Sequence, residues 1–218
     1  MDKLRLMYEQ TGRSIWCSHL DTMRTWQRAM NRAGVPIRYS EGFNPHAMIS
    51  ILMPLSVGTE SVCQLVDIRV KEDVELSDLP ERLNRVLPEG LRVLSVSEEG
   101  RKVAEVKWLA VEGHWEYDTA SPEEAAAALR TVFAAPVEVL RKTKRGEGLF
   151  MITDYMRSFT FEAEKGGVCI RGIVSCTDPV VNPDLLTAAV EQKLPAWKPD
   201  GGHFRRIELY CADGTIFR

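Results

Sequence analysis

The sequence of 218 residues lacks the cysteine patterns that mark most cysteine-based sites. Its five cysteines are an odd number, and no two of them stand at C-x-x-C spacing. Zinc ribbons, thioredoxin-like motifs, closely spaced iron–sulfur ligands and disulfide frameworks are therefore unsupported. Free thiols are typical of a reducing compartment, so we expect a cytoplasmic protein.

Long apolar runs and nucleotide-binding motifs are missing as well. The first residues hold no apolar stretch long enough for a signal peptide, and nowhere do ~18 apolar residues follow one another, so we expect no membrane span. No G-x-x-x-x-G-K-[ST] loop and no G-x-S-x-G elbow occurs. The four histidines show no metal-site spacing, and we expect neither a metal nor a cofactor.

A strong excess of positive charge is also lacking, since the formal net charge is −3. This value disfavours a protein that coats nucleic acid non-specifically. The charge is nevertheless segregated along the chain. Residues 1–50 hold seven Lys and Arg against four Asp and Glu, whereas residues 71–100 hold four against eight. The distribution leaves room for a small, directed anion-binding site.

What the sequence does contain is an ordinary globular composition, with 44% hydrophobic and 27% charged residues. In residues 1–98, apolar periodicity, helix caps and turns predict elements in the order β-α-β-β-α-β, the ferredoxin-like pattern. Residues 98–102 read as a polar linker, and residues 104–218 suggest a second such sheet with extra strands. We therefore predict an α+β fold of two tandem ferredoxin-like (βαββαβ) domains with antiparallel sheets, at 1–98 and 104–218.

The helix expected from residue 18 to about residue 33 has two distinct faces. Ser18 and Asp21 provide its N-terminal cap, and Gly34 is its C-terminal stop. An apolar stripe at 3-4-3 spacing consists of Met23, Trp26, Met30 and Ala33. The opposite side carries a row of arginines at every fourth position, Arg24, Arg28 and Arg32. This arginine row is either a surface for phosphates or for an acidic partner, or simply a solvated helix face.

The loop Gly42-Phe43-Asn44-Pro45-His46 is the least ordinary segment of the chain. Glycine permits close backbone approach, a phenylalanine can stack on a base, and a histidine can act as acid, base or donor near neutral pH. The alternative is a plain connection in which the phenylalanine fills the core and the histidine is solvent-exposed.

Two further features carry candidate residues. His19 lies in the first turn of the helix and could converge with His46, although no spacing rule links them and unrelated histidines are the simpler interpretation. A basic turn follows later in the chain, with the cations Arg141, Lys142, Lys144 and Arg145. This turn could bind phosphates, or its charges could keep the edge of a sheet from pairing with another strand.

Three stretches together resemble a bacterial family. They are the Ser-His-Leu-Asp segment at 18–21, the arginine-bearing helix that follows, and residues 39–46. An apolar run, 48–55, and Gly58 come next. In these stretches, and in residues 143–147, the chain is similar to the radical SAM-linked proteins of unknown function. That resemblance implies a radical SAM partner, because relatives are fused to, or encoded beside, a cobalamin-binding radical SAM protein. The chain lacks the C-x₃-C-x₂-C cluster motif, which fits an accessory role.

The leading hypothesis is a non-catalytic accessory protein that holds a substrate, expected to be RNA, for a radical SAM enzyme. Phosphate contacts would come from Arg24, Arg28, Lys142, Lys144 and Arg145. Phe43 would stack on a base, while Asn44 and His46 would position the target. One alternative is a metal-independent RNA-processing enzyme with His46 or His19 as general acid or base. Another is a pure docking module whose arginine row contacts an acidic face of a protein partner.

Overall fold

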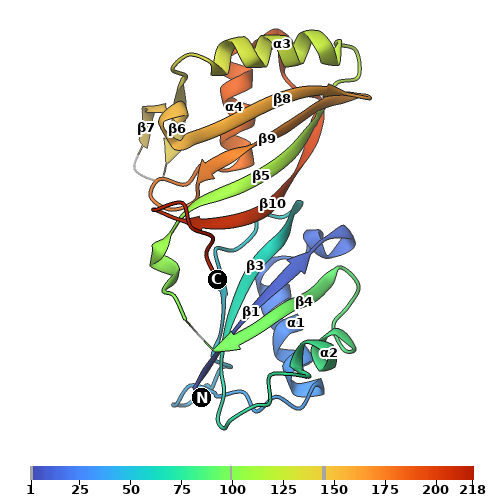
Figure 1. Cartoon of the computed structure of the whole chain (residues 1–218), viewed down its shortest axis with the longest axis vertical. Helices are drawn as coiled ribbons and strands as arrows, with labels where there is room; N and C mark the ends of the chain where they lie inside the picture. The colour runs from blue at the N-terminus through green and yellow to red at the C-terminus, as the bar shows by residue number, and fades with distance from the viewer. Residues whose placement is uncertain (1, 99, 144–145) are drawn as a thin grey trace. The chain divides into compact units, whose positions relative to one another are not determined.

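The computed structural model describes residues 2–98, 100–143 and 146–218. The chain divides into two compact units, Met1–Val103 with Arg218 and Ala104–Phe217. Each unit combines an antiparallel sheet with α-helices (Figure 1). The predicted α+β class is confirmed.

The first unit follows the order β-α-β-β-α-β. Its elements are β1 (Lys3–Gln10), α1 (His19–Arg32), β2 (Ile49–Leu52), β3 (Thr59–Arg69), α2 (Leu79–Asn84) and β4 (Leu91–Glu98). β1 pairs with both β3 and β4, and β2 pairs with β3, always antiparallel. The strands of this unit therefore lie in the order β4-β1-β3-β2.

Alternation along β1 builds the core of the first unit. Leu4, Leu6 and Tyr8 point to one face and are buried against residues of both helices, including Trp26 and Met30 of α1. The Tyr8 and Trp26 rings meet edge to face, with centroids 4.8 Å apart. The rest of the apolar stripe of α1 is partly buried against the same core, so the predicted buried face of this helix is confirmed.

The ends of α1 follow from local chemistry. The Ser18 hydroxyl accepts the backbone N–H of Asp21 at 3.2 Å and caps the helix. After the helix, Gly34 adopts a φ of +69°, which a residue with a side chain rarely adopts. The shorter helix α2 begins at Leu79 and has Pro80 in its first turn, where a residue that lacks an N–H is tolerated.

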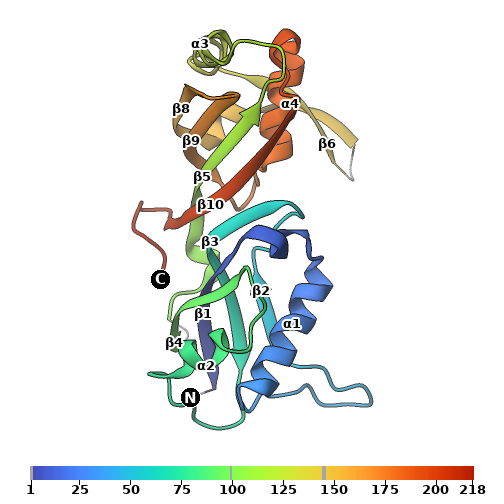
Figure 2. The same cartoon turned by 90° about the vertical axis from the view of Figure 1, so that its right-hand side faces the viewer.

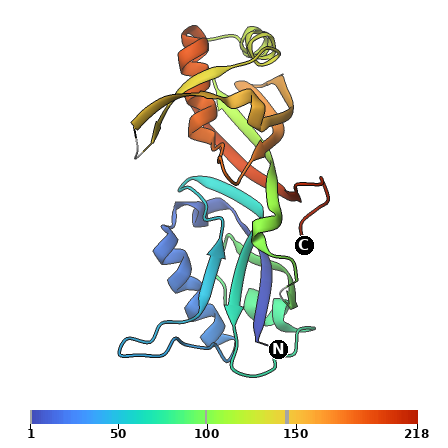
Figure 3. The ribbon, with the colours of Figure 1, turned by 90° about the vertical axis from the view of Figure 1, so that its left-hand side faces the viewer.

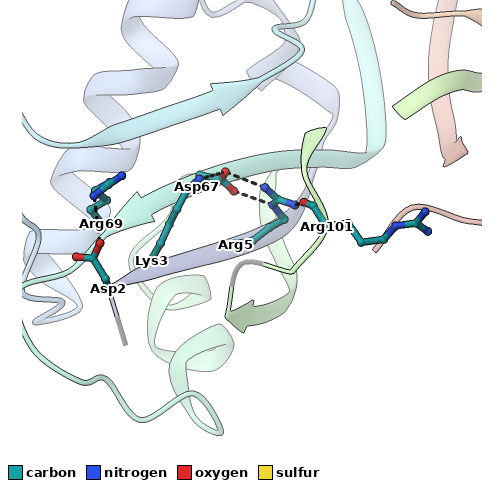
Figure 4. A network of polar contacts seen from close by, with 6 residues as sticks. All are labelled: Asp2, Lys3, Arg5, Asp67, Arg69 and Arg101. Atoms are coloured by element: carbon teal, nitrogen blue, oxygen red, sulfur yellow. Dashed lines mark hydrogen bonds and ion pairs between the residues drawn. The ribbon is translucent and has the colours of Figure 1, made fainter. Parts of the chain in front are cut away.

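The other face of β1 carries an ion-pair network (Figure 4). Arg5 and Asp67 stand opposite each other on β1 and β3 and are only 4% and 3% exposed. The Arg5 guanidinium donates to both carboxylate oxygens, at 2.8 and 2.9 Å, and Lys3 Nζ lies 2.9 Å from the same carboxylate. Burial alone would raise the pKa of Asp67, but the hydrogen bonds and charges of Arg5 and Lys3 outweigh it, so this pKa is lowered. Arg5 also donates to the carbonyl of Arg101, which ties the segment after β4 to the sheet.

The second unit holds the remaining strands and α-helices and the 3₁₀ turn η3. They are β5 (Val106–Glu116), α3 (Pro122–Phe133), β6 (Glu138–Thr143), β7 (Gly146–Met151), the 3₁₀ turn η3 (Ile152–Tyr155), β8 (Met156–Glu164), β9 (Gly167–Ser175), α4 (Pro183–Lys193) and β10 (Gly201–Cys211). Four strands form an antiparallel sheet in the order β10-β5-β9-β8.

The strands β6 and β7 form a separate hairpin between α3 and β8. The amide of Gln192 on α4 holds this hairpin, because it accepts the N–H of Leu140 at 2.8 Å and donates to its carbonyl at 3.2 Å. Side-chain caps start both helices of the unit, at Ser121 for α3 and at Asn182 for α4.

Candidate functional site

The segment between α1 and β2 folds back on itself as a narrow ribbon, residues 38–48, that extends away from the helix (Figures 2 and 3). Met48 N donates to the Arg38 carbonyl and Ser40 N to the His46 carbonyl, both at 2.9 Å. At the base, Arg38 N donates to the carbonyl of Arg69 at 2.8 Å. The 38–48 ribbon is therefore anchored on the end of β3. Residues 37–40 form this ribbon arm and isolated antiparallel bridges, Ile37 with Val70 and Tyr39 with Ala47.

The tip of the ribbon presents an aromatic ring to solvent. Gly42 has a φ of +117°, a conformation that L residues rarely adopt. The side chain of Phe43 is fully exposed, and Asn44 and His46 are exposed as well. The alternative in which Phe43 fills the core is therefore excluded. Function-bearing residues concentrate on loops held by a rigid scaffold, and a fully solvated phenylalanine on such a loop has no packing role in the folded chain.

His46 is oriented by its neighbour across the ribbon. Ser40 Oγ lies 2.8 Å from His46 Nδ1 and also accepts the backbone N–H of His46 at 3.1 Å. These contacts engage one ring nitrogen, while Nε2 makes no hydrogen bond to any residue that the structure describes. A single oriented histidine can donate to, or accept from, a ligand at this nitrogen.

Positive charge gathers at the base of the ribbon. Arg38 and Arg69 both pair with the Asp2 carboxylate, at 3.0 and 3.1 Å (Figure 4 draws Asp2 and Arg69). Lys71 lies over the Tyr39 ring, with its Nζ 5.8 Å from the centroid. The Tyr39 hydroxyl accepts from Gln27 of α1 at 3.4 Å, so the ribbon base packs beside this helix. Two arginines thus share one carboxylate, and a lysine lies beside them on the Tyr39 ring.

The arginine row of α1 is exposed, as the sequence pattern indicates. Arg24 contacts Asp21 at 3.4 Å, an exposed pair that contributes little to stability. The hydrogen bond from Ser18 and then the charge of Arg24 lower the pKa of Asp21. Arg28 and Arg32 make no ion pair with any described residue, so their guanidinium groups are available to an anionic ligand.

His19 is not brought to His46. It is the first residue of α1, and the ribbon leaves the other end of this helix, whose 14 residues span about 20 Å (Figure 2). His19 instead borders a pocket of about 10 Å³ beside Cys17 and Thr22, with room for one water molecule. The two histidines therefore do not form a paired acid and base within the chain.

The basic turn between β6 and β7 is only partly described. Lys144 and Arg145 lie outside the described residues, and of Lys142 only its place in β6 is given. Arg141 lies over the Phe150 ring, 5.1 Å from its centroid, and Phe150 stacks on Tyr155 at 5.0 Å. The predicted phosphate contacts of this turn stay a prediction.

The described part of the chain holds neither a candidate metal cluster nor a helix fit to span a membrane. Within residues 2–98, 100–143 and 146–218, no group of three or more His, Cys, Asp or Glu side chains is placed to hold a metal ion. In the same residues, no helix combines the length and the hydropathy that a membrane span requires.

One feature of the second unit has no counterpart in the sequence patterns. A pocket of about 250 Å³ lies between the end of α3 and β8. Its lining residues are Arg130, Phe133, Ala134, Thr153, Met156, Arg157, Ser158, Phe159 and Phe161. They come from a helix end, a 3₁₀ turn and a strand, so no local spacing predicts their convergence.

Comparisons with known proteins give distant structural similarities. No curated protein matches the chain. An unknown protein from Galdieria sulphuraria is 11% identical over 94% of this chain and 96% of its own, with a TM-score of 0.28. The small subunit of acetolactate synthase from Thermotoga maritima is 12% identical over 94% of both chains, with a TM-score of 0.25. At such scores neither similarity bears on function.

The sequence itself matches a protein-family model over most of its length. The match covers residues 3–183 and thus includes α1, the 38–48 ribbon and most of the second unit. The family's description is "Uncharacterized protein conserved in bacteria (DUF2344)". The chain belongs to this uncharacterised bacterial family.

Proposed function

We propose that this protein is a non-catalytic, cytoplasmic accessory protein that holds RNA for a radical SAM enzyme. The observation that carries the proposal is the full exposure of Phe43 at the tip of a ribbon anchored at its base. Unpaired bases are recognised by stacking on aromatic side chains, and each stacked base contributes about 1–3 kcal/mol. The proposal assigns this role to Phe43.

Positive charge beside the ribbon supports the choice of RNA. Arg28 is exposed and without an ion pair to any described residue, and at the ribbon base Arg38 and Arg69 share the single carboxylate of Asp2. Such cations bind the phosphates of RNA whatever the base sequence. His46, oriented by Ser40, and the amide of Asn44 would supply polar contacts to the stacked nucleotide.

We also infer that each unit is a ferredoxin-like domain. The strand order is β4-β1-β3-β2 in the first unit and β10-β5-β9-β8 in the second. When the strands of each unit are numbered along the chain and the β6–β7 hairpin is left out, both orders read 4-1-3-2. This order, with every pair antiparallel, supports the split β-α-β-β-α-β assignment. Sheets of this kind are frequent RNA platforms, which is an analogy at the level of the fold.

The radical SAM partner rests on the resemblance of residues 18–21 and 39–46. In the structure these segments flank α1 at its two ends, with the exposed arginine row between them. A partner that contacts this helix would therefore have all three features within reach.

RNA binding is tested by filter binding with single-stranded RNA over a range of salt concentrations. We expect micromolar or tighter binding at low salt that weakens steeply as salt rises. Phe43→Leu keeps an apolar side chain but removes the aromatic face, so it should weaken binding about tenfold or more, whereas Phe43→Trp should retain it. Arg28→Glu should weaken binding, and Arg92→Glu, at an exposed position on β4, is its charge-matched control. Absence of binding by the unmodified protein at low salt would overturn the RNA proposal.

A protein-docking role gives a different result in the same variants. If the partner co-purifies after nuclease treatment and is lost on charge reversal of Arg24 and Arg28, the arginine row contacts protein. If co-purification is lost on nuclease treatment, RNA bridges the two.

A further inference from the structure

We propose that the pocket between α3 and β8 binds a single nucleotide unit, with its base against the phenylalanines and its phosphate on Arg130. This site lies in the second unit and is separate from the 38–48 ribbon of the first. The inference therefore stands whether or not the ribbon binds RNA.

The size of the pocket sets the size of the ligand. At about 250 Å³ it lies just below the roughly 300–1,000 Å³ of pockets that enclose drug-sized ligands. A ligand with one or two rings and a compact charged group fits this volume, whereas a longer oligomer would have to leave most of its length outside.

Aromatic rings form one wall of the pocket. Phe161 is buried, and two half-buried rings flank it, Phe133 with its centroid at 5.3 Å and Phe159 at 6.1 Å. The three rings are tilted to one another by 31° and 38°, so together they form a curved apolar surface. Phenylalanine rings bind planar ligands by stacking or by edge contacts.

Charge in the pocket is of one sign. Arg130 and Arg157 both line it, and among the residues that the structure describes no acidic one does. The guanidinium of Arg130 donates to the Phe161 carbonyl at 2.6 Å, which fixes it beside the aromatic wall and leaves its other N–H groups for a ligand. The Arg157 guanidinium stacks over the Trp108 ring, 3.5 Å from its centroid, and the strand register places Arg157 on the opposite face of the sheet from Phe161. The phosphate contact therefore falls to Arg130. Neither arginine makes an ion pair with any described residue, and guanidinium groups suit phosphate.

The backbone is shaped to hold this wall. Ser158 has a φ of +52°, and the pairing of β8 with β9 shifts register between Arg157 and Thr160. Such bulges re-aim side chains and often lie next to binding sites. Phe159 then packs directly on Gly172 of β9, where an added Cβ atom would come within 2.4 Å of its ring. The backbone conformation of Ser158 and the missing side chain of Gly172 thus determine where the Phe159 ring packs.

Isothermal titration calorimetry on the full chain tests the site with AMP, adenosine and ribose 5-phosphate. We expect AMP to bind, and the two fragments to bind at least about tenfold more weakly, because each lacks one of the two recognised groups. Arg130→Gln should weaken AMP binding about tenfold or more, the loss expected for one charge-assisted hydrogen bond. Phe159→Leu should weaken it while leaving ribose 5-phosphate binding unchanged.

Control variants separate this site from other sources of binding. Arg171→Gln makes the same charge change on β9, at an arginine that pairs with Glu112 and Glu162, and should leave AMP binding unchanged. Phe43→Leu should also leave it unchanged, which distinguishes the pocket from the ribbon. Thermal unfolding of each variant checks that the chain is folded. Equal loss in Arg130→Gln and Arg171→Gln, or no AMP binding at millimolar concentration, would overturn the proposal.

Competition with short RNA identifies the source of the nucleotide. Displacement of AMP by an RNA with a 5′-phosphate, but not by the same RNA with a 5′-hydroxyl, would show that the pocket takes an RNA end. Displacement by neither RNA, with AMP still bound, would show that it takes a free nucleotide. Both results support the pocket as a nucleotide site.

Discussion

The buried pair Arg5–Asp67 offers the sharpest test of the first unit's architecture. The change Asp67→Asn keeps the shape of the side chain but replaces the carboxylate that the Arg5 guanidinium contacts by a neutral amide, where Arg5 is only 4% exposed. Removing one member of a buried pair costs about 3–5 kcal/mol, because the remaining charge is desolvated and uncompensated. Lys3 loses its partner as well, but it is more exposed and adds less.

The assay is urea unfolding, read on the transition of the first unit. We expect the free energy of unfolding to fall by about 3 kcal/mol or more in Asp67→Asn. The double variant Arg5→Met/Asp67→Leu removes both charges and should be far less destabilised than the single one, since apolar replacement of a whole buried pair is often neutral. A loss below about 1 kcal/mol in Asp67→Asn, or a double variant as unstable as the single one, would refute the reasoning.

The same pair predicts a dependence on pH. The folded pKa of Asp67 is lowered, so its contribution to stability is complete above the unfolded pKa of about 3.9 and is lost as the pH falls through the folded value. The unmodified protein should therefore have a higher free energy of unfolding than Asp67→Asn at neutral pH, and this difference should disappear below about pH 4. An advantage that stays constant down to pH 2 would contradict this.

Three further predictions concern single side chains. Burial and then the charge of Asp200 raise the pKa of Tyr117 to about 12, so the difference in ultraviolet titration between the unmodified protein and Tyr117→Phe should show the Tyr117 phenol still protonated at pH 11, and stability should fall as the pH rises from about 10 to 12. Burial raises the pKa of Cys176 to about 11, so a thiol reagent at pH 8 should modify the exposed Cys17 well before Cys176, as peptide mass spectrometry would show. Ser40→Ala removes the partner of His46 Nδ1 and should change the ¹⁵N shifts of that ring in NMR spectra, while Ser50→Ala, an exposed serine of β2, should not.

Local sequence signals predicted α1 well because its determinants are local. Ser18 and Gly34 define its ends, and the spacing of Trp26 and Met30 sets its buried face. The exposure of Phe43 could not be decided in this way, since a glycine-containing loop is compatible with a buried or a solvated phenylalanine. Only the backbone pairing of residues 38–48 settles which one occurs.

Features that depend on strand register were not predictable. Arg5 and Asp67 are 62 residues apart and meet because β1 and β3 pair in one particular register. The pocket of the second unit likewise needs a bulge in β8 and a glycine on the neighbouring strand β9. The residues that flank Arg5 in the sequence do not indicate a buried ion pair. The residues that flank Ser158 do not indicate a pocket.

The most direct test of the RNA proposal is ultraviolet crosslinking of bound single-stranded RNA, followed by mass spectrometry of the attached peptides. We expect the main crosslink on the 38–48 ribbon at Phe43, and we expect its loss in Phe43→Leu. Crosslinks confined to peptides outside the ribbon, or a yield that Phe43→Leu does not change, would contradict the assignment of this ring as the stacking platform.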